Sequence, residues 1–201
     1  MAELIVEMKD LEKKFLNSEM HRKIFQIYLP GLSKEREDRL KLNIVDLPES
    51  YLDVARRYNL LNVSVGMFSL WPGGRFKTLE DSVIDALNDS FFPKEFMEKH
   101  RMYQVGSYNT DLICVTVGTD QFANGEVLFV DEGFDIYNPE DSQVHHLAKD
   151  FEQFILVAAN LGRDGVNADS KEFPAKKQEF LDRLKRLGVD EKYRDIWLSL
   201  F

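Results

Sequence analysis

Two β-forming segments near the middle of the chain constrain its fold more than any other feature. The segments DLICVTVG and EVLFVD are rich in β-branched residues, and the polar stretch TDQFANG joins them. The Asn124-Gly125 dipeptide in this connection favours the positive-φ conformations that tight turns require. The sequence therefore predicts an antiparallel hairpin, and the later segment QVHHLA is expected to form a short edge strand.

Helical patterns precede this hairpin. Four apolar residues spaced at i, i+4, i+7 and i+11 predict an opening helix, and they are Leu4, Met8, Leu11 and Phe15. LPESYLDVARRYN predicts a second short helix, with Pro48 compatible with its first turn. LNVSVGMFSLWPGG then predicts one strand followed by a turn. After it come helical spacing from Leu79 to Leu87 and a break at Pro93, with room for a short helix beyond the break.

Three helices are predicted after the hairpin. KDFEQFILVAANLG has Asp150 at the N-cap position and Gln153 three residues later, as in a capping box. FPAKKQEFLDRLKRLG is expected to end at Gly188, and DEKYRDIWLSLF to begin after Asp190. The predicted fold class is α+β, with a central, mostly antiparallel sheet flanked by N- and C-terminal helices. Without an internal repeat or a linker marked by composition, residues 1–201 are expected to form a single domain, with helices 174–201 as an extension.

Negative charge is concentrated in one segment. The chain has a formal net charge of −9, and the 47 residues between Arg101 and Lys149 contain no Lys or Arg. The eight acidic residues of this segment are Asp111, Asp120, Glu126, Asp131, Glu132, Asp135, Glu140 and Asp141. The other 154 residues carry 26 basic and 27 acidic groups, so they are close to neutral. This balance argues against a nucleic-acid partner, because phosphate binding relies on clustered Lys and Arg.

The acidic segment predicts a surface for a positively charged protein partner. A solvated face normally mixes both signs of charge, and this segment does not. The predicted partner-binding residues are Asp120, Gln121, Asn124, Glu126, Asp131, Glu132, Asp135, Glu140 and Asp141. A second explanation remains open, because charged turns also keep strands soluble and protect exposed sheet edges.

Motifs for metal binding and catalysis are missing from the sequence. The stretch beginning at Asp120 has Phe122 and Val127 where a calcium loop needs oxygen ligands. His145 and His146 are adjacent, so in a strand they point to opposite faces, and His21 and His100 are expected to be surface side chains. Nucleophile, phosphate-loop and dinucleotide signatures are also missing. We expect no enzyme activity, no metal and no cofactor. A hydrolase that uses Asp120, Asp131 and Glu132 is retained as an alternative.

The compartment is predicted from the single cysteine and from the apolar runs. Cys114 lies in a β-branched segment and is expected to be a buried free thiol. No apolar run approaches the length of a membrane helix, and the N-terminal segment has acids inside its apolar part, unlike a signal peptide. We expect a cytoplasmic protein without a membrane partner; its oligomeric state is not predicted.

Several motifs together resemble the SUKH superfamily of Smi/Knr-like domains. An LPxxY helix is followed by a strand with a Pro turn, a hairpin with a Gly-containing turn, and an AxDFxxF helix. The corresponding residues are Leu47, Pro48 and Tyr51; Phe68, Leu70 and Pro72; Ile113, Asn124, Gly125 and Val127; and Ala148, Phe151, Phe154 and Ile155. The similarity covers roughly residues 1–161.

This resemblance implies a non-enzymatic, protein-binding domain. Many bacterial members of the superfamily are immunity proteins that neutralise a toxin encoded beside them, often a nuclease. Fungal relatives act as regulatory scaffolds in cell-wall signalling. Nuclease toxins must be basic to bind phosphate, so the acidic segment has the sign of charge that such a toxin would attract. The sequence predicts an immunity protein, with a Smi/Knr-like regulatory scaffold as the alternative.

Overall fold

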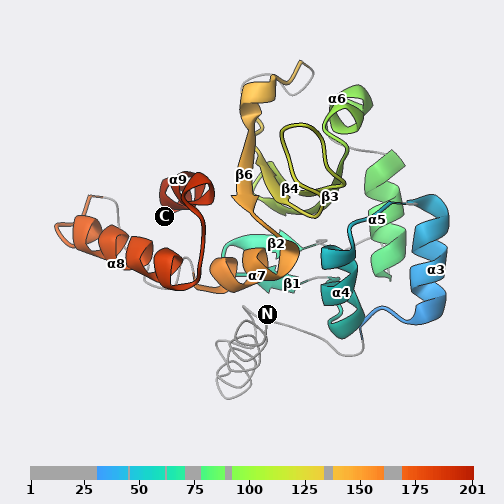
Figure 1. Ribbon diagram of the computed structural model, residues 1–201, viewed down its shortest axis with the longest axis horizontal. Coiled ribbons are helices and arrows are strands. Elements are labelled where there is room, and N and C mark those ends of the chain that lie inside the picture. The colour runs from blue at the N-terminus through green and yellow to red at the C-terminus, as the bar shows by residue number, and fades with distance from the viewer. Residues whose placement is uncertain are drawn as a thin grey trace.

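The computed structural model arranges its helices around one antiparallel sheet (Figure 1). It describes residues 31–44, 46–61, 63–70, 78–88, 92–133, 138–160 and 169–201. The predicted opening helix at Leu4 to Phe15 and His21 lie outside the described residues. The helices are α3 (Lys34–Asn43), α4 (Glu49–Arg57), α5 (Leu79–Asn88), α6 (Lys94–Lys99), α7 (Phe151–Asn160), α8 (Phe173–Arg186) and α9 (Glu191–Leu200).

The sheet has six strands in sequence order, each antiparallel to its neighbour. The strands are β1 (Val63–Val65), β2 (Phe68–Leu70), β3 (Met102–Tyr108), β4 (Asp111–Thr116), β5 (Val127–Val130) and β6 (Val144–Ala148). The predicted hairpin is confirmed, because Leu112 of β4 pairs with Val130 of β5. The edge strand is also confirmed, since β6 pairs with β5 and ends the strand order. The fold class is α+β, as predicted.

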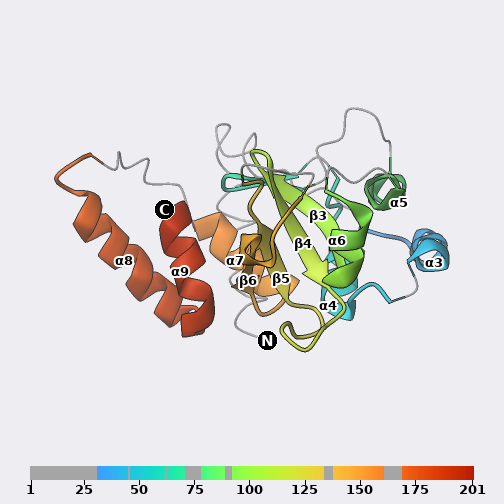
Figure 2. The same cartoon turned by 90° about the horizontal axis from the view of Figure 1, so that it is seen from above.

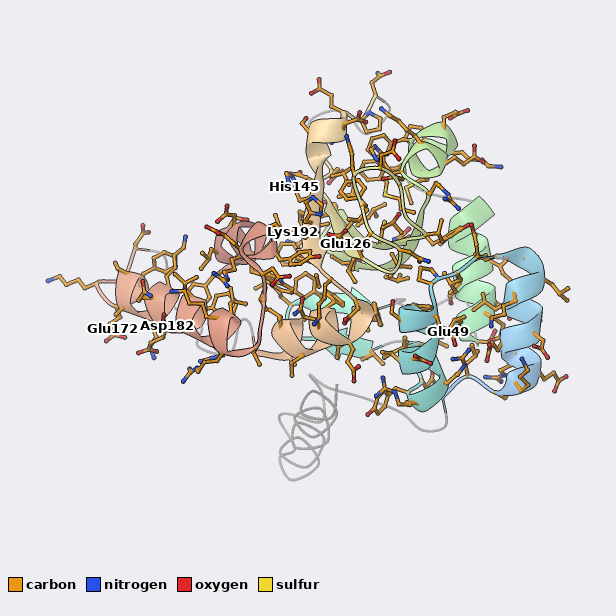
Figure 3. All side chains as sticks on the ribbon, viewed as in Figure 1. Glu49, Glu126, His145, Glu172, Asp182 and Lys192 are labelled. Atoms are coloured by element: carbon orange, nitrogen blue, oxygen red, sulfur yellow. The ribbon has the colours of Figure 1, made fainter. Side chains whose placement is uncertain are left out.

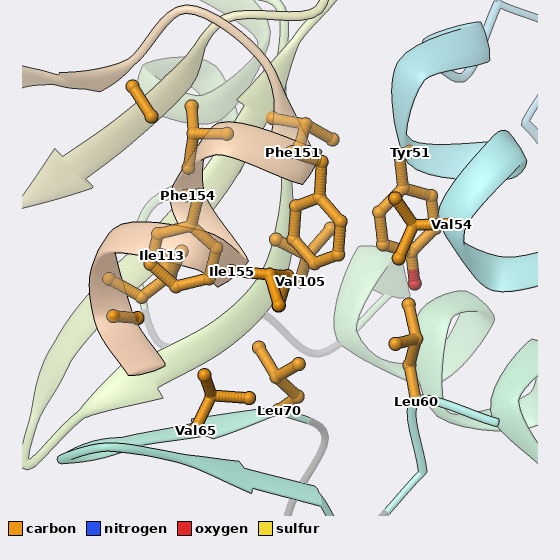
Figure 4. Close-up of a cluster of buried hydrophobic side chains, with 14 of the residues drawn as sticks. Tyr51, Val54, Leu60, Val65, Leu70, Val105, Ile113, Phe151, Phe154 and Ile155 are labelled. Atoms are coloured by element: carbon orange, nitrogen blue, oxygen red, sulfur yellow. The ribbon is translucent and has the colours of Figure 1, made fainter. Parts of the chain in front are cut away.

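Both faces of the sheet are buried. In β4, Ile113 belongs to the larger apolar cluster on one face, and Cys114 belongs to the smaller cluster on the other. The larger cluster includes Tyr51 of α4 and Phe154 of α7 (Figure 4). The smaller cluster is closed by Phe96 of α6. Burial on two sides explains why β4 and β5 are almost continuously apolar rather than alternating.

Local capping signals correctly predicted the helix that follows β6. The Asp150 carboxylate accepts a hydrogen bond of 2.7 Å from the Gln153 N–H, and the Gln153 side chain accepts one of 3.2 Å from the Lys149 N–H. The first bond satisfies a backbone donor that the first turn of the helix leaves unpaired, and the second ties Gln153 to the residue before the N-cap. In α4 the agreement is less complete, because Pro48 is the N-cap residue rather than part of the first turn.

The last helix is part of the core, not an extension. Trp197 of α9 is fully buried, and its indole N–H donates a 2.7 Å hydrogen bond to the Leu147 carbonyl of β6. Its ring also packs against Phe68 and Phe154. The packing of Trp197 thus places α9 within the core, whereas the sequence was expected to give helices 174–201 as an extension of the domain. Gly188, with φ of 67°, ends the preceding helix region as expected.

Three elements differ from the sequence prediction or were missed. The predicted single strand at VSVGMFSL is two strands, β1 and β2, because Gly66 adopts a φ of 60° and reverses the chain between them. β3 was not predicted, and its pairing with β4 shifts register between Gln104 and Gly106. α3 was not predicted because it is mostly polar, with only Glu37 and Leu40 buried.

Candidate functional site

The structure divides the predicted binding residues between the two ends of the β4–β5 hairpin. Asp120, Gln121 and Asn124 are exposed in the loop that connects the strands. Asp131 and Glu132 follow directly after β5, at the opposite end. The strands between these ends span about 15 Å at 3.3 Å per residue. The predicted residues therefore do not form one surface, and Asp135 lies outside the described residues.

Four carboxylates gather at the end of the hairpin away from the loop. We call Asp111, Asp131, Glu132 and Glu140 the acidic end. The Asp111 carboxylate accepts a 2.9 Å hydrogen bond from the Glu132 N–H. Gln143 links the group, because its side-chain amide donates to the carbonyls of Asp131 and Glu132 at 2.8 and 3.1 Å and accepts from the Glu140 N–H.

The charged groups near the Asp111 carboxylate are its acidic neighbours. Burial raises the pKa of Asp111, and the neighbouring charges of Asp131 and Glu132 raise it further, against a hydrogen bond from the Glu132 N–H. Within the described part of the chain, none of the four carboxylates forms an ion pair with a Lys, Arg or His. Asp131 and Glu140 are exposed, and Glu132 is half-buried. The arrangement presents uncompensated negative charge to solvent.

Asp141 lies beside the acidic end but is neutralised. The Lys99 ammonium contacts both its oxygens at 2.6 Å, and the ring Nε2 of His100 lies 3.0 Å from one of them. These contacts, with Lys99 contributing most, lower the pKa of Asp141. His100 itself is buried against Phe96 and Phe122, so the prediction that it is a surface side chain is wrong. Asp141 thus anchors α6 to the turn before β6.

Glu126 is fully buried and therefore cannot contact a partner. One carboxylate oxygen lies 2.6 Å from His146 Nδ1 and 2.9 Å from Lys192 Nζ, and the other accepts a 2.8 Å bond from the Ala123 N–H. Figure 3 shows Glu126 and Lys192 close together beside β6. Glu126, predicted to contact a partner, instead connects the hairpin loop, β6 and α9 through these hydrogen bonds.

The hairpin connection is longer than a tight turn. It runs from Val117 to Glu126, and positive φ occurs at Gly118 and Gly125 but not at Asn124. Gly125 has a φ of 85°, and a Cβ there would lie 2.7 Å from the Ser50 hydroxyl oxygen. The Ser50 hydroxyl also donates to the Gly125 carbonyl at 3.3 Å. The loop that carries Asp120 therefore packs against the start of α4, far from the acidic end.

The described residues hold neither a cluster of metal ligands nor a helix that could span a membrane. Across the residues that the structure describes, no group of three or more His, Cys, Asp or Glu side chains is placed to hold a metal ion. His145 and His146 are paired with Phe129 and Leu128, which belong to opposite faces, as their adjacency predicted. Over the same residues, every helix is too short or too polar to cross a membrane.

Sequence reasoning missed the two basic partners that neutralise acids of the predicted site. Lys99 is 42 residues from Asp141, and Lys192 is 66 residues from Glu126. No local pattern marks such pairs, because they depend on how distant elements pack.

Comparisons with known proteins gave no match: no protein-family model matches the chain, and neither does any curated protein or solved structure. The resemblance to the SUKH superfamily therefore stays a prediction from the sequence motifs.

Proposed function

We propose that this protein is a non-enzymatic binding domain whose acidic end binds a positively charged protein. The observation that carries the proposal is the gathering of Asp111, Asp131, Glu132 and Glu140 without an ion-pair partner in the described residues. Repulsion among like charges opposes folding, so a group of this kind is costly to keep unless it does something else. A basic partner would relieve the repulsion and would be attracted over long distances.

The partner class that fits best is a basic bacterial toxin, so the proposal names an immunity protein. This step rests on the sequence resemblance to SUKH domains, in which toxin neutralisation is common. We expect the contact region to consist of Asp131, Glu132 and Glu140. Glu126 is left out because it is buried, and Asp141 because it forms a surface ion pair with Lys99.

A growth experiment tests the proposal. The toxin encoded beside the gene is expressed with the protein, and cell survival is measured. The wild-type protein should restore growth, whereas the triple variant Asp131→Asn, Glu132→Gln and Glu140→Gln should protect much less, because it removes three charges from the acidic end. Survival that is the same with both proteins would contradict a role for the acidic end.

The chain offers a matched control for the charge change. Glu172→Gln, Glu179→Gln and Asp182→Asn remove three exposed charges from α8 and its N-cap. Figure 3 shows Asp182 on α8 and Glu172 at its N-terminal end, well away from the turn that precedes β6. This control should protect as well as the wild type. If no toxin is encoded nearby, the regulatory scaffold becomes the favoured function.

The hydrolase alternative has less support from the geometry. Its three residues lie at opposite ends of the hairpin, with Asp120 in the loop and Asp131 and Glu132 beyond β5. A general acid and a general base must both reach the same substrate bond. In glycoside hydrolases the two catalytic carboxylates are separated by less than about 10 Å. Asp120 therefore cannot be paired with Asp131 in one catalytic centre.

A further inference from the structure

A pocket of about 210 Å³ lies between α5, α6 and β3. Figure 2 shows α6 lying alongside β3, with α5 farther along the same side. Apolar side chains line much of the pocket, and they are Val83, Ala86, Met97, Met102 and Val117. An engineered cavity of about 150 Å³ is large enough to hold benzene. The pocket therefore has room for one aromatic ring with a substituent.

Arg101 supplies a positively charged group at the pocket. It has a φ of 47° directly after α6, a position where glycine is the usual residue because a side chain strains the backbone. Its guanidinium donates to the Gly118 carbonyl at 3.2 Å and to the Asp46 carboxylate at 3.1 Å. A guanidinium has five N–H groups. These two bonds use two of the five N–H groups. Within the described residues, the other three are open to the acceptor atoms of a ligand.

The remaining charges at the pocket largely cancel. Lys94 and Glu98 form an exposed pair one helical turn apart, at 3.6 Å. The Asp46 carboxylate accepts hydrogen bonds from two groups. One comes from Arg101, and the other comes from the Tyr103 hydroxyl at 2.7 Å. Burial raises the pKa of Tyr103 well above its ordinary value, and the bond to Asp46 raises it further, so the hydroxyl keeps its proton. Arg101 therefore shares Asp46 with the Tyr103 hydroxyl and keeps N–H groups that its bonds to Asp46 and Gly118 do not use.

We propose that this pocket binds a small aromatic carboxylate, with the ring between Met97 and Met102 and the carboxylate on Arg101. Methionine side chains adapt their shape and make favourable sulfur–aromatic contacts, and Arg binds carboxylates through paired N–H groups. The site is separate from the acidic end, so it adds a second ligand to the protein and does not depend on the proposed partner.

Methionine-methyl NMR tests the site directly. The chain has 6 methionines, so a sample labelled at the methionine methyl groups gives few signals. Adding 2-naphthoate should shift the Met97 and Met102 methyl signals in a saturable way, with Kd on the order of 0.1 to 1 mM for a ligand of this size. The Met67 signal should not move. The neutral 2-naphthamide should bind roughly three- to fivefold more weakly, which is the expected effect of losing an exposed charge pair.

Two variants separate the contributions of charge and space. Arg101→Gln should weaken naphthoate binding to the level of the naphthamide and leave naphthamide binding unchanged. Ala86→Leu, on the half-buried side of α5, should fill the pocket and abolish binding of both compounds. If Arg101→Gln does not fold, the proposal is tested by titrating Ala86→Leu and the wild type with the two compounds. Absence of saturable shifts at Met97 and Met102, or equal affinity for the two compounds, would overturn the proposal.

Discussion

At the scale of single residues, the environment of each carboxylate decides its role. Glu126 and Glu132 belong to the same acidic segment, but Glu126 is buried and paired with Lys192, whereas Glu132 remains partly exposed at the acidic end. Burial by itself would raise the pKa of Glu126. Hydrogen bonds from the Ala123 N–H, Lys192 and His146 outweigh it, so the pKa lies below its ordinary value of 4.5. Glu126 therefore stabilises the fold in its charged form.

Glu126→Gln should lower the free energy of unfolding by about 2 kcal/mol at pH 7, because it removes the charge that His146 and Lys192 face. Since the folded pKa is depressed, this stabilisation is complete above pH 4.5 and is lost as the pH falls through the folded pKa. Urea denaturation should show the gap between wild type and variant closing in acid. The exposed control Asp120→Asn should change stability by less than roughly 0.5 kcal/mol.

For Asp111 the pKa shift, and with it the dependence of stability on pH, has the opposite sign to that of Glu126. Its pKa is raised by burial and by Asp131 and Glu132, so the folded state loses stability as the pH rises past the ordinary value of 3.8. Asp111→Asn keeps an oxygen for the Glu132 N–H and removes the repulsion. It should raise the free energy of unfolding at pH 7 by roughly 0.5 kcal/mol in low salt, and less in high salt. A loss of stability in low salt would show that these acids do not repel one another.

At the scale of elements, local signals were predictable and distant contacts were not. α7 was predicted because Asp150 and Gln153 cap it from within its own sequence. β3 was missed because it depends on β2, whose Ser69 carbonyl approaches so closely that a Cβ at Gly106 would lie 2.8 Å from it. The contacts of Glu126 were also missed because they depend on a distant element: Lys192 belongs to the last helix.

The role of α9 in the core leads to a prediction for Trp197. Trp197→Phe removes the indole N–H that pairs with the Leu147 carbonyl and leaves space in the core, so it should cost about 3 kcal/mol of unfolding free energy. Chemical denaturation measures this loss. Ser199→Ala, on the exposed side of the same helix, is the control and should be nearly neutral. If Trp197→Phe were also neutral, α9 would be an extension after all.

At the scale of the whole molecule, negative charge is distributed unevenly. The acidic residues of the central segment that connect elements of the fold are paired with basic side chains. Glu126 and Asp141 have basic partners, and Asp120 stands alone in the loop beside α4. Asp111, Asp131, Glu132 and Glu140 remain as the acidic end. The sequence showed that the segment was acidic. It did not show which acids would be exposed together, because that depends on the hairpin register and on Gln143.

The most direct test of the acidic end is the rate at which the protein associates with the basic toxin proposed as its partner, measured by stopped-flow at increasing salt. The rate should fall about tenfold between low and high salt, because salt screens the attraction between opposite charges. The Asp131→Asn, Glu132→Gln and Glu140→Gln variant should associate slowly at every salt concentration, whereas the matched α8 variant should behave as the wild type. A rate that is independent of salt, or equally slow association of both variants, would contradict binding through the acidic end.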